Sequence, residues 1–330
     1  MSGVDVLIIG AGAAGLAAAG VLRAAGRSVA IADKGRVPGG RLATRILDGG
    51  RADYGAQFFT VRTPEFARAV AGWLDAGLVF EWSRGWSDGS LLAAPADSYP
   101  RYAAQAGFGA LAEHLAEGLD VRLDTRLVAL QQAKVGWAGV DAAGAVIEAR
   151  AVLLTAPVPQ SLALLAAGGV ALPPADRAAL AAVAYAPCLC GLFVVEGETQ
   201  LPEPGALQRP GHAVSWISDN QGKGISPQRR IVTVHAGREA STARWAQDDR
   251  HVLDWLASEL SPWLAPDAAV VGSSLKRWRY AVPTHLYHER CFVAALNPPL
   301  VFAGDAFDGP RVEGAFLSGW AAGQRLLVAL

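Results

Sequence analysis

The spacing of hydrophobic and polar residues predicts a strand–helix–strand unit at the start of the chain. Residues 4–9 are almost all apolar, as in a parallel strand that is buried on both faces. A helical stretch follows the glycines of residues 10–15 and runs to Ala25, and a second apolar strand covers residues 28–32 and ends at Asp33. Two parallel strands joined by a helix over this length form one βαβ unit, which indicates an α/β domain.

Later segments show two kinds of pattern. Some are typical of a mixed sheet, and others predict strands and helices that belong to the first domain. The expected strands cover residues 57–61, 121–131, 146–155, 183–196, 231–236 and 300–303, and the expected helices cover residues 64–76, 108–119, 248–260 and 312–327. We therefore expect an α/β fold in which a Rossmann-like domain is built from separated pieces, with a mixed-sheet α+β domain inserted between them. The expected boundaries are residues 1–60, 105–160 and 285–330 for the first domain, and residues 61–104 and 161–284 for the inserted domain.

Composition and charge exclude several classes of partner. The 330 residues are 52% hydrophobic, which is enough for large cores, and 29 basic side chains nearly balance 30 acidic ones. A net charge of -1 gives no general attraction to nucleic acid or to an anionic membrane. The opening residues resemble no signal peptide, and no uninterrupted apolar run reaches the length of about 18 residues that a membrane helix needs. We expect a cytoplasmic protein.

The three cysteines do not suggest a disulfide framework or a metal site. Cys188 and Cys190 are separated by one residue, whereas redox and zinc motifs have two, and Cys291 stands alone. We expect all three to be small buried side chains, and we expect no metal site.

The segment Gly10-Ala11-Gly12-Ala13-Ala14-Gly15 has the G-x-G-x-x-G spacing of a dinucleotide-binding turn. In such a turn the first glycine permits the tight bend, the second lets a pyrophosphate approach the backbone, and the third allows close packing of helix and strand. Asp33 ends the second strand about 20 residues further on, where a carboxylate can accept hydrogen bonds from a ribose. The alternative is a purely structural glycine-rich turn, but the strand, the helix and Asp33 together favour dinucleotide binding.

Two further segments extend this potential site. Gly39-Gly40-Arg41 follows the βαβ unit and could wrap phosphates or the edge of a flavin, although Arg41 could also be an ordinary surface arginine. Gly304-Asp305 follows an apolar strand, and a helix is expected to begin near Val312. The free N–H groups at that helix end could stabilise negative charge on a reduced flavin, with Glu313 acting as a helix cap.

Taken together, these segments resemble the FAD-dependent amine oxidase superfamily, whose fold is related to that of p-hydroxybenzoate hydroxylase. More narrowly, the chain resembles the renalase family and its bacterial relatives. That narrower resemblance rests on the order and spacing of four blocks at residues 53–59, 155–160, 276–281 and 311–319. The resemblance spans nearly the whole chain.

The resemblance implies one non-covalently bound FAD. The implied contacts fall on Gly10, Gly12, Ala13, Ala14, Gly15, Asp33, Lys34, Gly40, Arg41, Ala56, Gln57, Leu127, Gly304, Asp305, Val312 and Glu313. Leu127 stands where the family usually has valine, which a main-chain contact to adenine should tolerate. The region near residue 305 lacks the cysteine that attaches flavin covalently in some relatives.

Three residues are candidates for the catalytic site. The family places Gln57 against the flavin ring, although Phe58 and Phe59 beside it also fit an ordinary core strand. Trp278 and Tyr280 share one face of a strand, so they could line a substrate cavity or simply belong to the core. His285 and His288 follow this strand, and a surface position suits them better than a catalytic one.

The resemblance implies an oxidase that returns 2- and 6-dihydro isomers of NAD(P) to NAD(P)+ and passes the electrons to O2, forming hydrogen peroxide. Hydride loss from such a ring needs no general base, so the lack of an obvious acid–base pair is consistent with it. One alternative is a flavin amine oxidase that acts on a small amine held between aromatic side chains. Another is a flavin-binding protein without turnover. The sequence contains no second dinucleotide motif, so any nicotinamide would enter as substrate.

Overall fold

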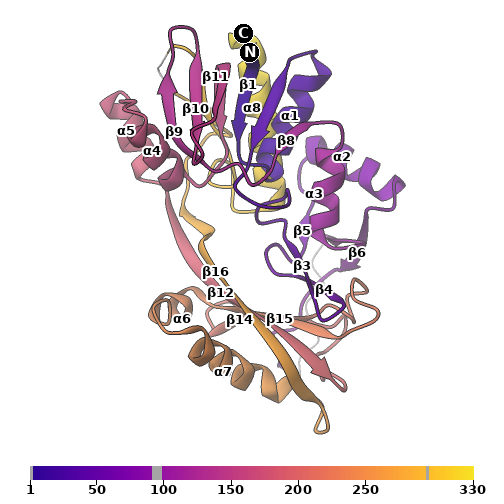
Figure 1. Ribbon diagram of the computed structural model, residues 1–330. Helices are drawn as coiled ribbons and strands as arrows, with labels where there is room; N and C mark the ends of the chain where they lie inside the picture. The colour runs from indigo at the N-terminus through magenta and orange to yellow at the C-terminus, as the bar shows by residue number, and fades with distance from the viewer. Residues whose placement is uncertain (1–2, 91–98, 295–296) are drawn as a thin grey trace. The chain divides into compact units, whose positions relative to one another are not determined.

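The structure is a computed structural model that describes residues 3–90, 99–294 and 297–330. The chain divides into two compact units, which are described separately. Unit 1 comprises Met1–Gly40, Ala112–Ala184 and Pro283–Leu330, and unit 2 comprises Arg41–Leu111 and Tyr185–Val282. Each unit is therefore assembled from stretches that are far apart in the sequence (Figure 1).

Unit 1 contains an eight-stranded sheet whose centre is the predicted βαβ unit. Its main path runs in the order β17-β18-β11-β1-β2-β8, and β11 also pairs with β10, which pairs with β9. The strands are β1 (Val4–Ile9), β2 (Val29–Ala32), β8 (Asp120–Arg122), β9 (Leu127–Gln132), β10 (Trp137–Asp141), β11 (Val146–Leu154), β17 (Phe292–Val293) and β18 (Leu300–Phe302). The pairs β1–β2, β1–β11, β2–β8 and β11–β18 are parallel. The carboxyl ends of these parallel strands therefore meet at one edge of the sheet.

The helices of unit 1 include two that pack closely against each other, α1 (Ala13–Ala24) and α8 (Val312–Ala329). A Cβ atom on Gly319 of α8 would lie 1.9 Å from the main-chain oxygen of Ala14 in α1. Only glycine permits this approach, so the contact fixes how the two helices cross (Figure 1). Unit 1 also contains α4 (Val158–Ala167) and α5 (Pro174–Ala181).

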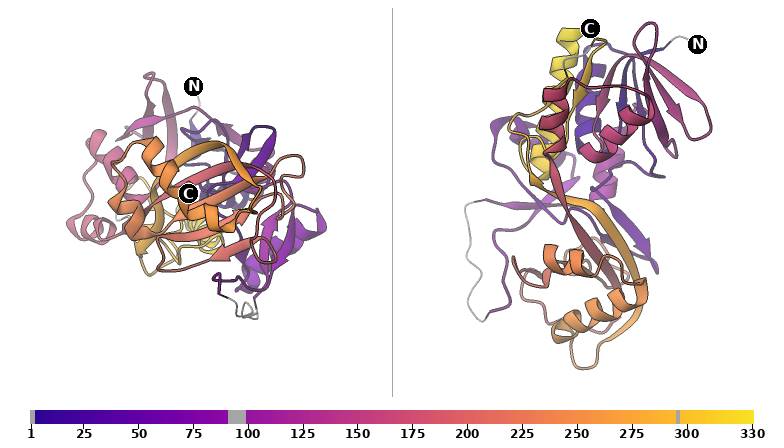
Figure 2. Two further views of the ribbon diagram at one scale, coloured as in Figure 1. Left: turned by 90° about the horizontal axis from the view of Figure 1, so that it is seen from below. Right: turned by 90° about the vertical axis from the view of Figure 1, so that its left-hand side faces the viewer.

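Unit 2 is built around a five-stranded sheet in the order β13-β14-β15-β12-β16. Its strands are β12 (Ala184–Glu196), β13 (Ala206–Gln208), β14 (Val214–Asp219), β15 (Ile231–Ala236) and β16 (Ala269–His285). The helices α6 (Arg238–Ala243) and α7 (Asp249–Leu260) lie on one face of this sheet, as two views show (Figures 1 and 2). Apolar side chains of α7, including Val252, Leu256 and Leu260, share a core cluster with Phe193 and Val234 of the sheet.

Smaller elements complete unit 2. They are β3 (Thr44–Leu47), β4 (Gly50–Asp53), β5 (Phe59–Thr60), α2 (Pro64–Asp75), β6 (Val79–Ser83), β7 (Arg101–Ala104), the 3-10 turn η1 (Ser261–Trp263), and α3 (Phe108–Ala116), which continues into unit 1. The helix α2 begins where Thr63 accepts a hydrogen bond from the N–H of Phe66 and Pro64 occupies the first turn.

The α/β fold class predicted from the sequence is confirmed, with a mixed, largely parallel sheet and a separate antiparallel sheet. The compact units differ from the expected domain boundaries at residues 161–184 and 283–284, which belong to unit 1, and at residues 105–111, which belong to unit 2. They also differ at residues 41–60, which belong to unit 2. These residues pack there because Ala52 of β4 shares a buried cluster with Cys190, Leu192 and Ile231 of the five-stranded sheet. Which residues form the cofactor domain in the functional sense stays a prediction.

Among the residues that the structure describes, no helix combines the length and the apolar character that crossing a bilayer requires.

Candidate functional site

The turn between β1 and α1 has the geometry of a phosphate-binding loop. Gly10 has a φ of +114°, which favours glycine, and a Cβ atom on Gly15 would lie 2.0 Å from the main-chain oxygen of Gly10. At Gly12 the nearest atom to such a Cβ is the oxygen of Gly39, 3.8 Å away. Gly10 and Gly15 therefore serve the fold itself, whereas Gly12 leaves open space beside the helix.

The start of α1 can accept an anion. Its N-cap is Gly12, no side chain caps it, and its first turn holds no acidic residue. The N–H groups of Ala13 and Ala14 carry the positive end of the helix dipole, which suits a pyrophosphate.

The Asp33 carboxylate lies at the end of β2, as predicted. It accepts hydrogen bonds from the N–H of Ala11 at 2.7 Å and from the N–H of Gly35 at 2.6 Å, one on each oxygen. Each carboxylate oxygen can accept a second hydrogen bond, so Asp33 keeps capacity for a ribose hydroxyl. The neighbouring Lys34 is exposed.

The loop that contains Gly40 docks on the same turn. The N–H of Gly39 donates to the oxygen of Ala11 at 2.7 Å, and Gly40 has a φ of +59°. The glycine-rich turn and this second loop therefore form one continuous backbone surface.

The ends of β11 and β18 meet the β1 turn at the same sheet edge. Thr155, which follows β11, donates to the oxygens of Ile9 and Gly10, and a Cβ on Gly304 would lie 3.7 Å from the oxygen of Thr155. Thr155 was not predicted as a site residue. The sequence offered two signals for it, its position at the end of an expected strand and its place at the start of the block at residues 155–160.

The remaining predicted cofactor residues of unit 1 lie on other elements. Leu127 begins β9, and Asp305 follows β18 and is half-buried. Val312 begins α8, whose N-cap has no side-chain hydrogen bond, and Glu313 is buried in its first turn. These residues fit a bound dinucleotide in unit 1 because they offer main-chain donors, a carboxylate and an uncapped helix start.

The predicted residues of unit 2 form a second group, joined by hydrogen bonds between segments about 240 positions apart. The Arg41 guanidinium donates to the oxygens of Tyr280 and Ala281, each at 3.2 Å. The N–H of Ala56 donates to the oxygen of Arg41 at 2.9 Å. Arg41 thus lies between the Ala56 segment and β16, and its side chain is only partly exposed.

Trp278 and Tyr280 occupy one face of β16, as predicted, and both are half-buried. Trp278 stacks on Tyr54 with ring centroids 5.4 Å apart and donates from its indole nitrogen to the oxygen of Tyr54. Tyr280 meets Tyr185 edge to face at 5.5 Å. Arg277 lies on the opposite face and donates to main-chain oxygens before α7.

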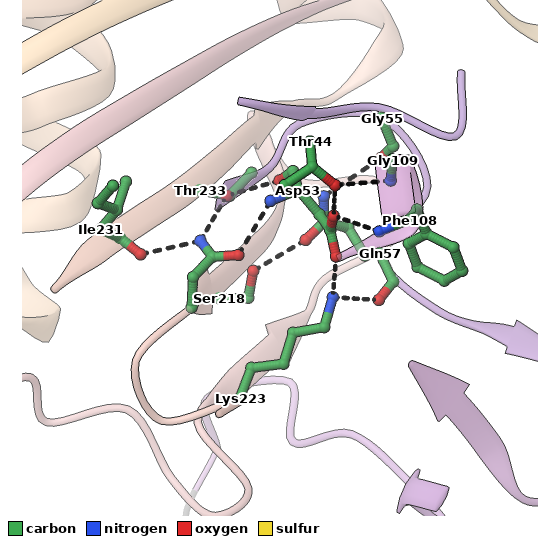
Figure 3. Close-up of polar contacts among 11 residues, drawn as sticks. Thr44, Asp53, Gly55, Gln57, Phe108, Gly109, Ser218, Lys223, Ile231 and Thr233 are labelled. Carbon is green, nitrogen blue, oxygen red and sulfur yellow. Dashed lines mark hydrogen bonds and ion pairs between the residues drawn. The ribbon is translucent and has the colours of Figure 1, made fainter. Parts of the chain in front are cut away.

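Gln57 is held by hydrogen bonds within unit 2. Its side-chain nitrogen donates to the oxygens of Asp53 and Gly55, and its side-chain oxygen accepts a hydrogen bond from Ser218 at 3.0 Å (Figure 3). The side chain of Gln57 therefore orders its own loop, and its predicted contact with the flavin stays a prediction. Lys223 and Asp53, which complete this network, were not predicted as site residues.

Burial shifts the pKa values of several groups near these residues. It lowers the pKa of His235 on β15 to about 4, with a smaller opposing effect from the main chain of Tyr54, so this side chain is neutral at pH 7. Burial raises the pKa of Cys188 to about 12 and raises the pKa of Cys190 well above its ordinary value. All three cysteines are free; Cys190 and Cys291 are buried, as expected, whereas Cys188 is only partly buried. His285 and His288 are exposed, and the described part of the chain contains no cluster suited to a metal ion.

Comparison with known families decides the assignment. Residues 8–73 match the NAD(P)-binding Rossmann-like domain, and residues 74–327 match the flavin containing amine oxidoreductase model, which covers more than half of the chain. The chain belongs to the flavin-containing amine oxidoreductase family. Membership of this family implies FAD as cofactor and an oxidoreductase activity.

Solved structures show the same fold for this flavin-containing amine oxidoreductase. A putrescine oxidase variant matches with a TM-score of 0.73 at 16% identity over 99% of both chains, and wild-type putrescine oxidase bound to putrescine matches with a TM-score of 0.70 at 16% identity over 98% of this chain and 99% of that one. A protein from Exiguobacterium sp. 255-15, described as a candidate protoporphyrinogen oxidase, matches with a TM-score of 0.72 at 15% identity over 100% of both chains. Identities this low establish the fold and leave the substrate open.

Proposed function

We propose that the protein is an oxidase that holds FAD non-covalently and oxidises a small organic molecule. The observation that carries the proposal is the arrangement at the carboxyl ends of β1 and β2. There, open space at Gly12, an uncapped start of α1 and the Asp33 carboxylate lie together. Bound FAD would accept the electrons of the substrate and pass them to O2, which yields hydrogen peroxide.

In this proposal, different residues of the chain bind different parts of FAD. The N–H groups of Ala13 and Ala14 hold the pyrophosphate, and Asp33 accepts hydrogen bonds from the adenosine ribose. The start of α8 at Val312, whose N-cap has no side-chain hydrogen bond, would stabilise negative charge on a flavin bound beside it. Arg41 and the Ala56–Gln57 segment contact the flavin ring, as the family resemblance implies.

For the substrate we favour a 2- or 6-dihydro isomer of NAD(P), because the charges around Trp278 suit an anionic molecule. The Lys276 ammonium lies 4.8 Å from the centroid of the Trp278 ring, and Arg45 acts electrostatically on Tyr54, which stacks on Trp278. Two cationic side chains attract the phosphates of a dinucleotide and repel a diammonium ion.

The second candidate is a small amine. The family match and the putrescine complex of a structural neighbour support an amine more directly than a dinucleotide. An amine would be held in its neutral form beside the aromatic rings of Trp278 and Tyr280.

The deciding experiment is anaerobic mixing of the purified protein with dihydronicotinamide isomers and with small amines, while flavin absorbance is followed. Rapid bleaching by a 2- or 6-dihydro isomer supports the first candidate. Turnover of an amine together with no bleaching by any isomer would replace it with the second. If no compound bleaches the flavin, the remaining alternative is a flavin-binding protein without turnover.

A further inference from the structure

We propose that Asp53 and Lys223 act as a positioning pair that sets the conformation of residues 55–57, the segment assigned above to the flavin. This inference rests on the proposed FAD site. It assigns a role to two residues that lie outside the predicted site.

The pair is a fully buried ion pair. The Lys223 ammonium lies 2.6 Å from the Asp53 carboxylate, and both side chains are 0% exposed. The rings of Trp82 and Phe108 face the ammonium at 4.8 and 5.4 Å. Burial lowers the pKa of Lys223, and Asp53 opposes this shift.

Stability alone does not explain such a pair. Removing two charges from water costs several kcal/mol per ion, and apolar residues of similar volume often serve a core equally well. A buried pair that also makes directed hydrogen bonds can instead fix one backbone arrangement.

The hydrogen bonds donated by Lys223 and by the Gln57 side chain converge on residues 53–57. Lys223 donates a second hydrogen bond to the main-chain oxygen of Gln57 at 2.8 Å, so one ammonium joins Asp53 to Gln57. The Gln57 side chain returns to the oxygens of Asp53 and Gly55 at 2.8 and 3.2 Å. Figure 3 shows this closed set of contacts from the Lys223 side chain to the Gln57 loop.

The Asp53 end of the loop is equally fixed. One carboxylate oxygen accepts hydrogen bonds from Thr44 and from the N–H of Phe108, which leaves the other for Lys223. The main-chain oxygen of Asp53 accepts from Thr233. The Asp53 side chain therefore links this end of the loop to β3 and α3, and the Asp53 main chain links it to β15.

The same loop determines the position of Arg41. Ala56 donates to the oxygen of Arg41, and Arg41 donates to the oxygens of Tyr280 and Ala281. If the loop shifts, the predicted flavin contacts at Ala56 and Gln57 shift with Arg41. The pair would thus control flavin geometry through the backbone.

The test is the double variant Asp53→Asn with Lys223→Met, prepared as holoenzyme. It removes both charges together, so no unpaired buried charge remains, and the asparagine oxygen can still accept from Thr44 and Phe108. The main-chain oxygen of Gln57 loses the hydrogen bond that Lys223 donates. We expect a Tm close to that of the wild type, at least a tenfold increase in the Kd for FAD, and a changed visible circular dichroism spectrum of the bound flavin.

The control is Arg230→Met, which breaks another largely buried ion pair of unit 2, between Arg230 and Asp219 at 2.9 Å. In the described part of the chain, neither side chain of this pair bonds to residues 53–57, so we expect a lower Tm with unchanged FAD affinity and flavin spectrum. An unchanged Kd and spectrum in the double variant would overturn the inference, and so would an equal change in the control.

A milder variant decides the matter if the double variant does not fold. Thr44→Val removes one hydrogen bond to the Asp53 carboxylate of the pair, and we expect the Kd for FAD to rise about two- to tenfold. An unchanged Kd there overturns the inference. The proposed function is tested separately, on the wild-type protein. If that protein purifies without bound flavin, the proposed function itself is overturned before any variant is made.

Discussion

Gly12 and Gly15 stand three positions apart in one turn, yet the structure gives them different tasks. A side chain at Gly12 meets nothing within 3.8 Å, whereas a side chain at Gly15 would overlap the oxygen of Gly10. Gly12→Val should therefore fold with the Tm of FAD-free wild type and retain no FAD, because the valine fills the pyrophosphate space. Flavin content and Tm are the measurements.

The matched control is Gly15→Ala, which should lower the Tm of the FAD-free protein itself, because its Cβ would lie 2.0 Å from a main-chain oxygen. Full flavin occupancy in Gly12→Val would show that the turn does not hold a pyrophosphate.

Arg41 is the second residue whose role can be tested alone. Arg41→Ala removes the donor to the oxygens of Tyr280 and Ala281, and hydrogen bonds from charged groups contribute about 1.5–3 kcal/mol each. We expect weaker FAD retention or slower flavin reduction, measured by titration and stopped-flow absorbance. Arg51→Ala, at an exposed position of β4, is the control and should change neither. If the two variants have the same FAD affinity and the same rate of flavin reduction, Arg41 has no specific role in either.

At the scale of elements, the contact between α1 and α8 is the most sensitive to side-chain size. Gly319→Val places a side chain against the oxygen of Ala14, so we expect a loss of at least about 1–3 kcal/mol in the free energy of unfolding. Gly20→Ala is the control within α1, since nothing lies within 4 Å of its added Cβ, and it should stabilise the protein by about 0.4–1 kcal/mol. Denaturant unfolding measures both. A valine tolerated at position 319 would mean that the helices do not cross as described.

Elements with a strong local pattern were predictable from sequence. The strand at residues 4–9 and the strand at residues 231–236 agree with β1 and β15, because a nearly continuous apolar run determines β1 and the β-branched residues 231–234 favour a strand at β15. The expected strand at residues 121–131 is two strands, β8 and β9. The turn between them is marked by Asp124, whose φ of +50° no periodicity reveals.

The candidate site was predictable only in part. Glycine spacing and the position of Asp33 identified the nucleotide-binding turn, because that turn lies within one βαβ unit. The contact between Asp53 and Lys223 was not predictable, since 170 positions separate them and each looks like an ordinary charged residue in the sequence. Pairings of this kind depend on the tertiary fold.

At the scale of the whole molecule, pH separates the two substrate candidates. Hydride loss from a dihydronicotinamide releases no proton, so flavin reduction should be nearly constant between about pH 6 and 9. His235, with a pKa of about 4, stays neutral throughout this range, and Cys188, with a pKa of about 12, stays protonated, so neither adds a titration.

An amine gives the opposite profile. Only the neutral amine can donate, and with an ordinary pKa of about 10.4 the rate should rise steeply as the pH increases over the same range. Anaerobic stopped-flow bleaching at low and saturating substrate concentration measures the profile. A steep rise with a dihydronicotinamide isomer would contradict direct hydride transfer.

The packing of α1 against α8 also has a consequence for the order in which the protein is made. The sheet neighbours of β1 include β11, and α1 needs α8, which leaves the ribosome nearly 300 residues later. At a synthesis rate of about 5–20 residues per second, α1 waits roughly 15–60 s for its partner helix. During that interval the face of α1 that packs against α8 is uncovered in the nascent chain, whereas the strands of the five-stranded sheet of unit 2 are all made by residue 285, so we expect that sheet to form first.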